Sequence, residues 1–363
     1  MRGDSGQRRR ARRAAATVLA ALGLFCAGGC SGKASGSAAG GGYIVGIDEG
    51  GGGIRVLSAG AATGMEAAPA SAAGKLQARS FVSLADAAWQ WERSAPPAAI
   101  LIGEAWARAH GMPSDWLRRI GRISAGSGQP VALAVVEGTA QRFLERQGGT
   151  ALAAQLKELL GGWAASPSVF PGRPGALAPA EGDSALPFLS QAAADGQRTV
   201  RAVLFRKRQF AAVLSQDEAA WMACLRGGSS PLPLKLAAAE AGSRGQASPA
   251  ADGLVPARCR WQADAGGGLR QPRFKLRVAL EVEPLSLPNG TMPSPDAVRS
   301  AAVQGVHGLL RQLQAHDADP LGLGQALRSV YRGVWNPDRW REAWTAAETD
   351  VEVRVNIDGG VWK

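Results

Sequence analysis

The side chains that most often carry enzyme or metal chemistry are few in this sequence and are scattered along it. It holds three histidines, His110, His307 and His316. Only His316 lies beside acids, Asp317 and Asp319, in a cluster that could bind a cation. Asp319 precedes a proline in a pattern typical of a helix start, so a capping role is favoured. No zinc-ligand spacing, nucleophile elbow or paired-acid constellation occurs. We therefore expect no enzyme, no cofactor and no bound metal.

Two groups of residues are candidates for contact with a partner protein. Arg206-Lys207-Arg208 forms the basic tip of a predicted hairpin, and Trp335, Trp340 and Trp344 follow near the C-terminus. Tryptophan is common among the residues that dominate binding energy at interfaces. Trp340 and Trp344, however, are four residues apart on one helix face, a spacing more typical of core positions. The core is the favoured interpretation for these two rings, and a partner interface is the alternative.

Glu104 and two cysteines complete the set of candidate groups. Glu104 directly follows a strand pattern, where a carboxylate could be functional, but a charge at a helix start is the favoured interpretation. Cys224 and Cys259 are the cysteines that lie beyond the first 30 residues. A disulfide between them would stabilise the fold by roughly 3–4 kcal/mol. Two isolated cysteines are more often buried thiols, and the sequence leaves the pairing open.

Residues 1–29 have the pattern of a signal peptide. Six arginines between Arg2 and Arg13 precede an apolar run over 14–25, which is too short to cross a hydrocarbon core of about 30 Å. Ala27-Gly28-Gly29 then leads to Cys30, an order that suits cleavage before Cys30 and attachment of a diacylglycerol to its sulfur. We expect lipidation at Cys30 and a flexible Gly/Ser/Ala tether over 31–42. An ordinary secretory signal cut nearby is the alternative.

The charge of the mature chain is modestly positive. The whole sequence carries +11, and the first 29 residues hold six Arg and one Asp, which leaves +6. Outside the cell this charge favours anionic phospholipid or wall polymer over nucleic acid, although a solvated surface explains it equally well. About 330 residues are too many for one compact core and indicate two or three domains.

The first half of the folded chain alternates strand and helix patterns, which indicates a mainly parallel or mixed sheet. A glycine-rich turn joins two apolar runs in a predicted hairpin, and a loop without periodicity follows. In order, the predicted elements are a hairpin over 43–57, a loop over 59–78, a short helix over 86–91, a strand over 98–103, helices over 104–110 and 113–123, a strand over 131–136 and a helix over 138–144.

The second half ends in a compact α+β pattern. Its three helices should begin at Ser294-Pro295, Asp319-Pro320 and Asn336-Pro337, because a short polar cap followed by proline suits a helix start. Alternating strands over 274–282 and 351–357 bracket these helices. The remaining predicted features are a linker over 161–181, a basic-tipped hairpin over 200–214, a helix over 217–225 and a stretch of weak pattern over 236–269.

The predicted fold class is α/β (mixed α+β), with several domains built from mixed sheets flanked by helices. Three domains are expected after the signal peptide and the lipidated tether (30–42). They are an N-terminal α/β domain (43–150), a middle domain with the linker and the basic-tipped hairpin (151–265) and a C-terminal α+β domain (266–363).

The order of these elements resembles the Ger(x)C family, the lipoprotein C subunits of nutrient germinant receptors in endospore-forming bacteria. The resemblance extends over roughly residues 43–360 and rests on the order of its pieces. The chain departs from the family directly after Cys30, where Ser31-Gly32-Lys33 replaces a Trp-Asp-Arg-Arg-Glu-like run. The matching pieces are Ile44-Val45-Gly46-Ile47-Asp48, Ile100–Glu104 with Ala107 and Gly111, Arg122 before the strand at Val131 with Glu137-Gly138, Ala202–Phe205 leading to Leu214, Asp319–Gly324, Trp335–Trp344, and Val351–Ile357 with Gly359.

The resemblance implies a three-domain assembly anchored by acylated Cys30 at the outer face of the inner spore membrane, with membrane-embedded A and B subunits as partners. We expect a non-enzymatic scaffold or coupling subunit needed for spore germination, with no nucleic acid and no assigned small-molecule ligand. The alternative is a solute-binding lipoprotein that captures a small nutrient directly, although that class normally shows two larger α/β lobes. A wall-acting hydrolase would need an acid or metal constellation that the sequence does not show.

Overall fold

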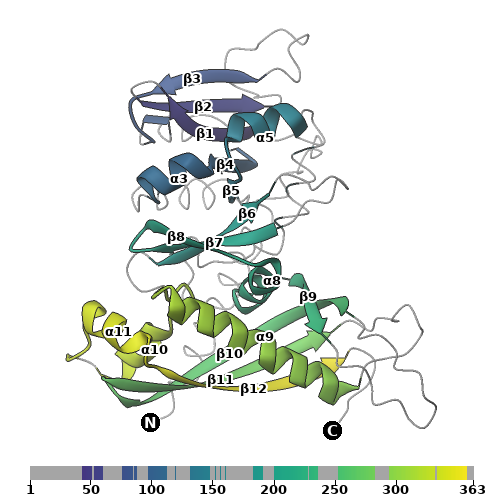
Figure 1. The fold of residues 1–363 in the computed structure, drawn as a ribbon, viewed down its shortest axis with the longest axis vertical. Helices are drawn as coiled ribbons and strands as arrows, with labels where there is room; N and C mark the ends of the chain where they lie inside the picture. Colours follow the sequence, from purple (N-terminus) through teal and green to yellow (C-terminus); the bar gives the residue numbers. More distant parts are fainter. Residues whose placement is uncertain are drawn as a thin grey trace, which may run out of the picture. The chain divides into compact units, whose positions relative to one another are not determined.

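A computed structural model gives the fold of the chain (Figure 1). It describes residues 43–50, 53–59, 76–84, 86, 87, 97–112, 119, 131–147, 152, 156, 160, 183–190, 200–227, 229–235, 252–282, 294–331 and 333–357. Several predicted features lie outside these residues, namely the signal peptide, Cys30, the tether over 31–42, the linker over 161–181 and most of the helices predicted over 86–91 and 113–123.

The first sheet has eight strands in the order β3-β2-β1-β4-β5-β6-β7-β8. The predicted hairpin is confirmed, because β1 (Ile44–Gly50) and β2 (Gly53–Ala59) pair antiparallel. β4 (Ala99–Gly103) lies parallel to β1, and β5 (Ala132–Val136) lies parallel to β4. The alternation of strand and helix patterns in the sequence thus gives the mixed sheet that it predicts.

The central strands are buried on both faces, which explains their continuous apolar sequence. Every residue of β4 and β5 is buried. Ile100 and Ile102 of β4 pack on one face with Trp106 of α3 (Glu104–His110). Leu101 packs on the other face with Phe143 of α5 (Ala140–Gln147). The two helices therefore cover opposite faces of the sheet.

Asp48 ties the end of β1 to the start of α5. Its Oδ1 accepts a hydrogen bond from the Ala140 N–H and its Oδ2 from the Gln141 N–H, both at 2.8 Å. Burial raises the pKa of Asp48, and these two N–H donors oppose the rise. A Cβ on Gly103 would lie 2.2 Å from Oδ1, so glycine is required beside this carboxylate. Asp48 in the Ile44–Asp48 run is thus a helix cap supplied from a distant strand.

The sheet continues through β6 (Ser184–Leu189), which is parallel to β5, and then through two antiparallel strands. β7 (Val200–Arg206) and β8 (Gln209–Leu214) form the predicted basic-tipped hairpin. Lys207 and Arg208 have φ values of 47° and 68°, as a two-residue turn with the right-handed strand twist requires. At the opposite edge, β3 (Gln77–Phe81) pairs with β2, so the loop predicted over 59–78 is wrong at its C-terminal end. Ala78, Arg79 and Ser80 of this edge strand are exposed, which removes the periodic apolar signal.

The second sheet has four strands in the order β12-β11-β10-β9. Alternate residues of β11 (Gln271–Val282) are buried. β12 (Glu348–Ile357) runs parallel to β11, because the three helices between the two strands give the chain enough length to return to the same end of the sheet. β10 (Asp252–Gly268) lies between β11 and β9 (Ser229–Lys235). The stretch of weak pattern over 236–269 thus contains a long strand that its residues did not predict. Pairing with neighbours on both sides holds this strand, although its C-terminal part is mainly small residues.

Helices α8 and α9 pack on this sheet and begin at well-formed caps. Ser215 and Glu218 form a capping box at α8 (Gln216–Leu225). Ser294 accepts from the Ala297 N–H at α9 (Pro295–Ala315), and the apolar residues on one side of this helix are buried. The core around these helices also includes Ala202 and Leu204 of β7.

The two shorter helices differ in how well their starts were predicted. Asn336 caps α11 (Pro337–Trp344) by accepting from the Asp338 and Arg339 N–H groups, as predicted. α10 (Leu323–Val330) begins three residues after Pro320, so the helix start predicted at Asp319-Pro320 is displaced. Gly322, with φ of 76°, makes the turn between that proline and the helix.

Cys224 and Cys259 form a disulfide, which settles the pairing that the sequence left open against the favoured buried thiols. Cys224 lies near the end of α8 and Cys259 lies in β10, with their Cα atoms 5.2 Å apart. The pairing depends on how α8 packs against the sheet, and spacing along the chain carries no information about that contact.

Candidate functional site, a buried carboxylate junction

Asp183 connects two segments that are far apart in the sequence. It lies directly before β6 and is 3% exposed. Its Oδ1 accepts from the Lys207 N–H in the β7–β8 turn at 2.9 Å, and its Oδ2 accepts from the Asp319 N–H at 3.0 Å. These partners are 24 and 136 residues away along the chain. One carboxylate therefore holds the hairpin turn to the segment that precedes α10.

Asp319 is buried beside it, at 1% exposure. Its Oδ1 accepts from the Leu323 N–H at 2.9 Å, and its Oδ2 accepts from the Gly324 N–H at 2.8 Å and from the Trp340 indole Nε1 at 3.2 Å. The capping role predicted for Asp319 is confirmed, although it caps α10 from four residues before the first helical position. We call Asp183, Lys207, Asp319, Trp340 and Arg341 the carboxylate junction.

Burial dominates the electrostatics of this junction. It raises the pKa of Asp319 to about 7, against the opposing effect of its backbone N–H donors, and the charge of Asp183 adds to the rise. Burial also raises the pKa of Asp183, opposed by the Lys207 and Asp319 N–H groups and by the Arg341 guanidinium, whose Nη2 lies 3.9 Å from Oδ1. Burial and the neighbouring Asp183 thus disfavour the charged form of Asp319, and the N–H donors favour it.

Three residues predicted as a partner contact, Arg206-Lys207-Arg208, contact this chain itself in the structure. Arg206 forms an ion pair with Asp317 at the end of α9. Lys207 donates its backbone N–H to Asp183, and its Nζ lies 4.0 Å from Asp338. The carbonyl oxygen of Arg208 accepts from the Met112 N–H at 2.7 Å. The turn therefore touches both the segment after α3 and the C-terminal helices, and its contact with an external partner stays a prediction.

Two of the three tryptophans lie in the core, as their spacing favoured. Trp340 and Trp344 are 2% and 1% exposed. The Trp340 ring meets Phe274 of β11 edge to face, with centroids 5.7 Å apart, and the Trp344 Nε1 donates to the Ala318 carbonyl at 3.0 Å. Trp335 is only partly buried, and the Arg328 guanidinium lies 5.3 Å from its ring centre. A partner contact at Trp335 stays a prediction.

The remaining candidate side chains have local structural partners. Glu104 is the first residue of α3 and accepts from the Arg108 Nε at 2.8 Å, which fits the role of a helix-start charge. His110, at the end of the same helix, lies 3.6 Å from Glu49. Asp319 is committed to capping and Asp317 to Arg206. Among the described residues, no three histidine, cysteine or acidic side chains gather where a metal ion could bind.

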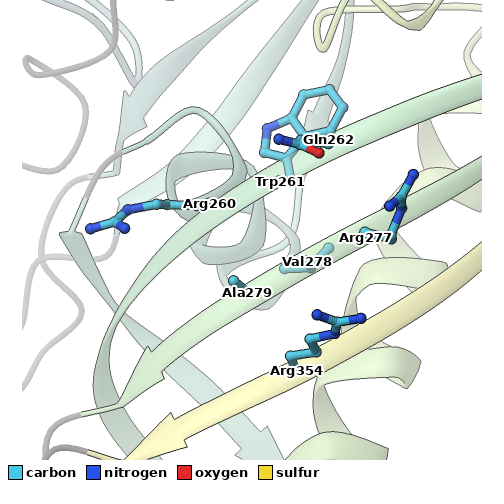
Figure 2. Close-up of a pocket in the computed structure, with 7 residues that line it drawn as sticks. All are labelled: Arg260, Trp261, Gln262, Arg277, Val278, Ala279 and Arg354. Atoms are coloured by element: carbon cyan, nitrogen blue, oxygen red, sulfur yellow. The ribbon is translucent and has the colours of Figure 1, made fainter.

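A second candidate site is the outer face of the four-stranded sheet, shown in Figure 2. A shallow depression of about 240 Å³ lies around Ala279, and Arg260, Arg277 and Arg354 come to it from three neighbouring strands. Each arginine already faces a carboxylate, because Arg260 lies 3.2 Å from Glu281, Arg354 lies 3.6 Å from Glu352, and Arg277 pairs with Asp264. The positive charges on this exposed face are therefore paired with negative ones. The carboxylate junction, whose charged groups are buried, is the stronger candidate site.

Comparison with known proteins finds a similarity in the C-terminal part of the chain. Residues 295–360 match the family described as Spore germination B3/GerAC like, C-terminal. This segment, which we call the GerAC-like segment, is therefore similar to that family. The family segment covers α9, α10, α11 and β12, and so includes Asp319, Trp340 and Arg341 of the carboxylate junction.

A solved structure described as the crystal structure of the GerBC protein is also similar, at 14% identity and a TM-score of 0.42 over 87% of this chain and 97% of that one. The search of curated proteins found no significant match. Within the described residues, no helix combines the length and apolar character needed to cross a membrane.

Asp183 is the functional candidate that sequence reasoning missed. It follows an Ala/Pro/Gly-rich stretch, has no periodic pattern around it and has no neighbouring charged partner in the sequence that would mark it as buried. Its role is created by Lys207 and Asp319, which come to it only through the folding of the sheet and the C-terminal helices.

Proposed function

We propose that this protein is the lipid-anchored C subunit of a nutrient germinant receptor and acts as a non-enzymatic scaffold or coupling component in spore germination. The observation that carries the proposal is the match of residues 295–360 to the GerAC-like family. The anchor would be Cys30 acylated after removal of residues 1–29, at the outer face of the inner spore membrane. Membrane-embedded A and B subunits would be its partners.

Two further features support this proposal. The Cys224–Cys259 disulfide fits a location outside the cytoplasm, since such bonds persist in oxidising compartments. The GerAC-like segment is joined to the rest of the chain by a buried hydrogen bond from the Asp319 N–H to Asp183, whose other oxygen accepts from the β7–β8 turn. A tethered chain also gains effective concentration toward partners in the same membrane, so that modest direct contacts suffice.

The experiment that tests the proposal is deletion of the chain from a spore former that carries it. Spores without it should respond poorly to the nutrients of its receptor and should still germinate with agents that bypass receptors. Re-expression of the full chain should restore the nutrient response. A normal nutrient response in the deletion strain, with the other receptors of that strain also removed, would refute the proposal.

Calorimetry distinguishes a coupling subunit from the alternative, a solute-binding lipoprotein. The full chain in non-ionic detergent is titrated with germinant amino acids and sugars at millimolar concentration. A coupling subunit should give no saturable heat. A saturable signal with a dissociation constant in the micromolar range would instead assign direct nutrient capture to this chain.

A further inference from the structure

Two valines in the connection between α10 and α11 expose their side chains to solvent. Val330, the last residue of α10, is 54% exposed, and Val334 is 52% exposed. Among the described residues, Val82 is the only other large apolar side chain that is exposed by more than half. Trp335 follows Val334 directly and is partly buried. We call Val330, Val334 and Trp335 the apolar tip.

Hydrogen bonds fix the backbone on both sides of the apolar tip. The N–H groups of Val334 and Trp335 donate to the Tyr331 carbonyl at 3.3 and 3.1 Å. The Tyr331 hydroxyl donates to the Gly267 carbonyl at the end of β10. Asn336, which follows the tip, caps α11. The valines are thus exposed in a well-formed part of the chain, although burial of apolar side chains is favourable.

Three exposed arginines lie next to this tip. Arg328 is in the last turn of α10, and Arg339 is in the first turn of α11. Arg270 is in the turn after β10, three residues beyond the carbonyl that Tyr331 contacts. The Arg328 guanidinium also lies 5.3 Å from the centre of the Trp335 ring. The apolar side chains are therefore accompanied by positive charge from three elements.

These arginines differ from those on the outer face of the four-stranded sheet. There, each arginine at the depression faces a carboxylate. In the part of the chain that the structure describes, no acid forms an ion pair with the three arginines beside the tip. The acid next to Arg339 in the sequence, Asp338, lies 3.5 Å from Arg341 and 4.0 Å from Lys207. The positive charge beside the tip is thus available to an external anion.

Exposed valines beside unpaired arginines suit the surface of an anionic bilayer. Small apolar side chains can enter the boundary between headgroups and acyl chains, where tryptophan is also enriched, and arginine binds phosphate oxygens. A protein partner fits less well, because binding energy at protein interfaces comes mainly from aromatic and arginine side chains in closely packed pockets. The apolar tip offers two valines and a ring that already packs against Arg328.

We propose that the apolar tip is a second contact of this chain with the membrane, in addition to the acylated cysteine. The tip enters the interfacial layer of a bilayer that contains anionic phospholipid, and the three neighbouring arginines bind the headgroup phosphates. The inference rests on the proposed function in one respect, namely that the chain is held at a membrane. A flexible tether leaves the orientation of the chain free, whereas this contact orients the GerAC-like segment toward the bilayer.

A fluorescent label on Val334→Cys tests the contact in the full chain. The chain is purified from a bacterial host that acylates lipoproteins and is added to preformed vesicles of phosphatidylglycerol and phosphatidylcholine, or of phosphatidylcholine alone. With phosphatidylglycerol, the emission of the label should shift to shorter wavelength, and phospholipids with brominated acyl chains should quench it. A label on Ala78→Cys, at an exposed position of β3, should show neither effect. The wild type, treated in the same way, reports any label on native thiols.

Variants of the labelled chain separate the charges from the apolar contact. Arg328→Glu combined with Arg339→Glu should abolish the shift, and lysine at both positions should preserve it. Val330→Asp should also abolish it, and salt at about 0.5 M should weaken it by screening. Circular dichroism and the unfolding midpoint check that each variant is folded.

The amount of chain that sediments with the vesicles reports the anchor independently of the label. An unshifted label on a chain that sediments would therefore overturn the tip contact and leave the proposed anchor in place. An unshifted label on a chain that does not sediment would overturn both. An equal shift with phosphatidylcholine alone would refute the role of the arginines. A label that becomes shielded only when partner subunits are added would assign the tip to a protein contact and overturn the proposal.

Discussion

Replacement of Trp340 distinguishes a core role from an interface role for this residue. The ring is buried against Phe274 and Trp344, with centroid distances of 5.7 and 5.3 Å, and its Nε1 donates to Asp319. Trp340→Ala removes these contacts and leaves a cavity, which typically costs about 3–5 kcal/mol. Gly324 packs directly against the indole, because a Cβ added there would lie 2.5 Å from the indole nitrogen. This neighbour therefore has no side chain that could enter the cavity.

Trp340→Phe isolates the hydrogen bond from the ring. It keeps an aromatic side chain of the core and loses the N–H donor to the buried Asp319 carboxylate, at a cost of about 1–3 kcal/mol. Because the donor favours the ionised carboxylate, its loss should also raise the pKa of Asp319 further. The order of stabilities should therefore be wild type, Trp340→Phe and Trp340→Ala.

The assay is urea unfolding of the full chain in detergent, followed by far-ultraviolet circular dichroism, with the free energy of unfolding taken from the midpoint and slope. Trp335→Ala, at a partly exposed ring, is the matched control and should cost less than Trp340→Ala. An unchanged midpoint for Trp340→Ala, together with loss of assembly with partner subunits, would show that the core reasoning is wrong and that the ring acts at an interface.

The remaining predictions concern the disulfide, one glycine and the anchor. Replacing Cys224 and Cys259 together by Ala should lower the free energy of unfolding by about 4 kcal/mol for a separation of 35 residues; equal unfolding midpoints for this variant and the oxidised chain would contradict it. Gly111 has φ of 64° and ψ of −148°, and a Cβ there would lie 2.1 Å from a carbonyl oxygen of the β7–β8 turn. Gly111→Ala should therefore cost more than the roughly 1–3 kcal/mol of the backbone conformation alone. Gly227→Ala, with φ of 82° and open space around the Cβ, is the control, and equal losses of thermal stability in the two variants would rule out the clash. Cys30→Ala should release the chain from membranes or leave it unprocessed, because each buried acyl CH₂ contributes about 0.8 kcal/mol; normal cleavage with full membrane retention, measured by fractionation, would count against lipidation.

The carboxylate junction gives these predictions a common structural basis. Trp340 donates to Asp319, the Asp319 N–H donates to Asp183, and Asp183 accepts from the turn that also contacts Met112. A substitution at one of these residues should therefore change the contribution of the others to stability. The changes in the free energy of unfolding for pairs of substitutions within the junction should not be additive. Combining Trp340→Phe with Asp183→Asn is the direct way to measure that coupling.

Local patterns in the sequence determined much of the fold. The alternation of Phe274, Leu276 and Val278 predicted a strand with one buried face because side chains of a strand point alternately to its two sides. Ser294 and Asn336 marked helix starts because their side chains bond to N–H groups only two or three residues away. The four-residue spacing of Trp340 and Trp344 favoured the core for the same kind of local reason. In each of these cases the residues that carry the pattern lie within one helix or one strand, a few positions apart along the chain.

The features that only the tertiary structure decided depend on partners far away in the chain. β10 is a strand because β9 and β11 lie on both sides of it, not because of its own residues, many of which are small. The Cys224–Cys259 bond required the packing of α8 on the sheet. Asp183 gained its role from an N–H group 136 residues away, and the same burial raised the pKa of Asp319 to about 7. Desolvation and long-range pairing leave no trace in local spacing, so the sequence predicted the cap at Asp319 and the structure alone revealed the junction around it.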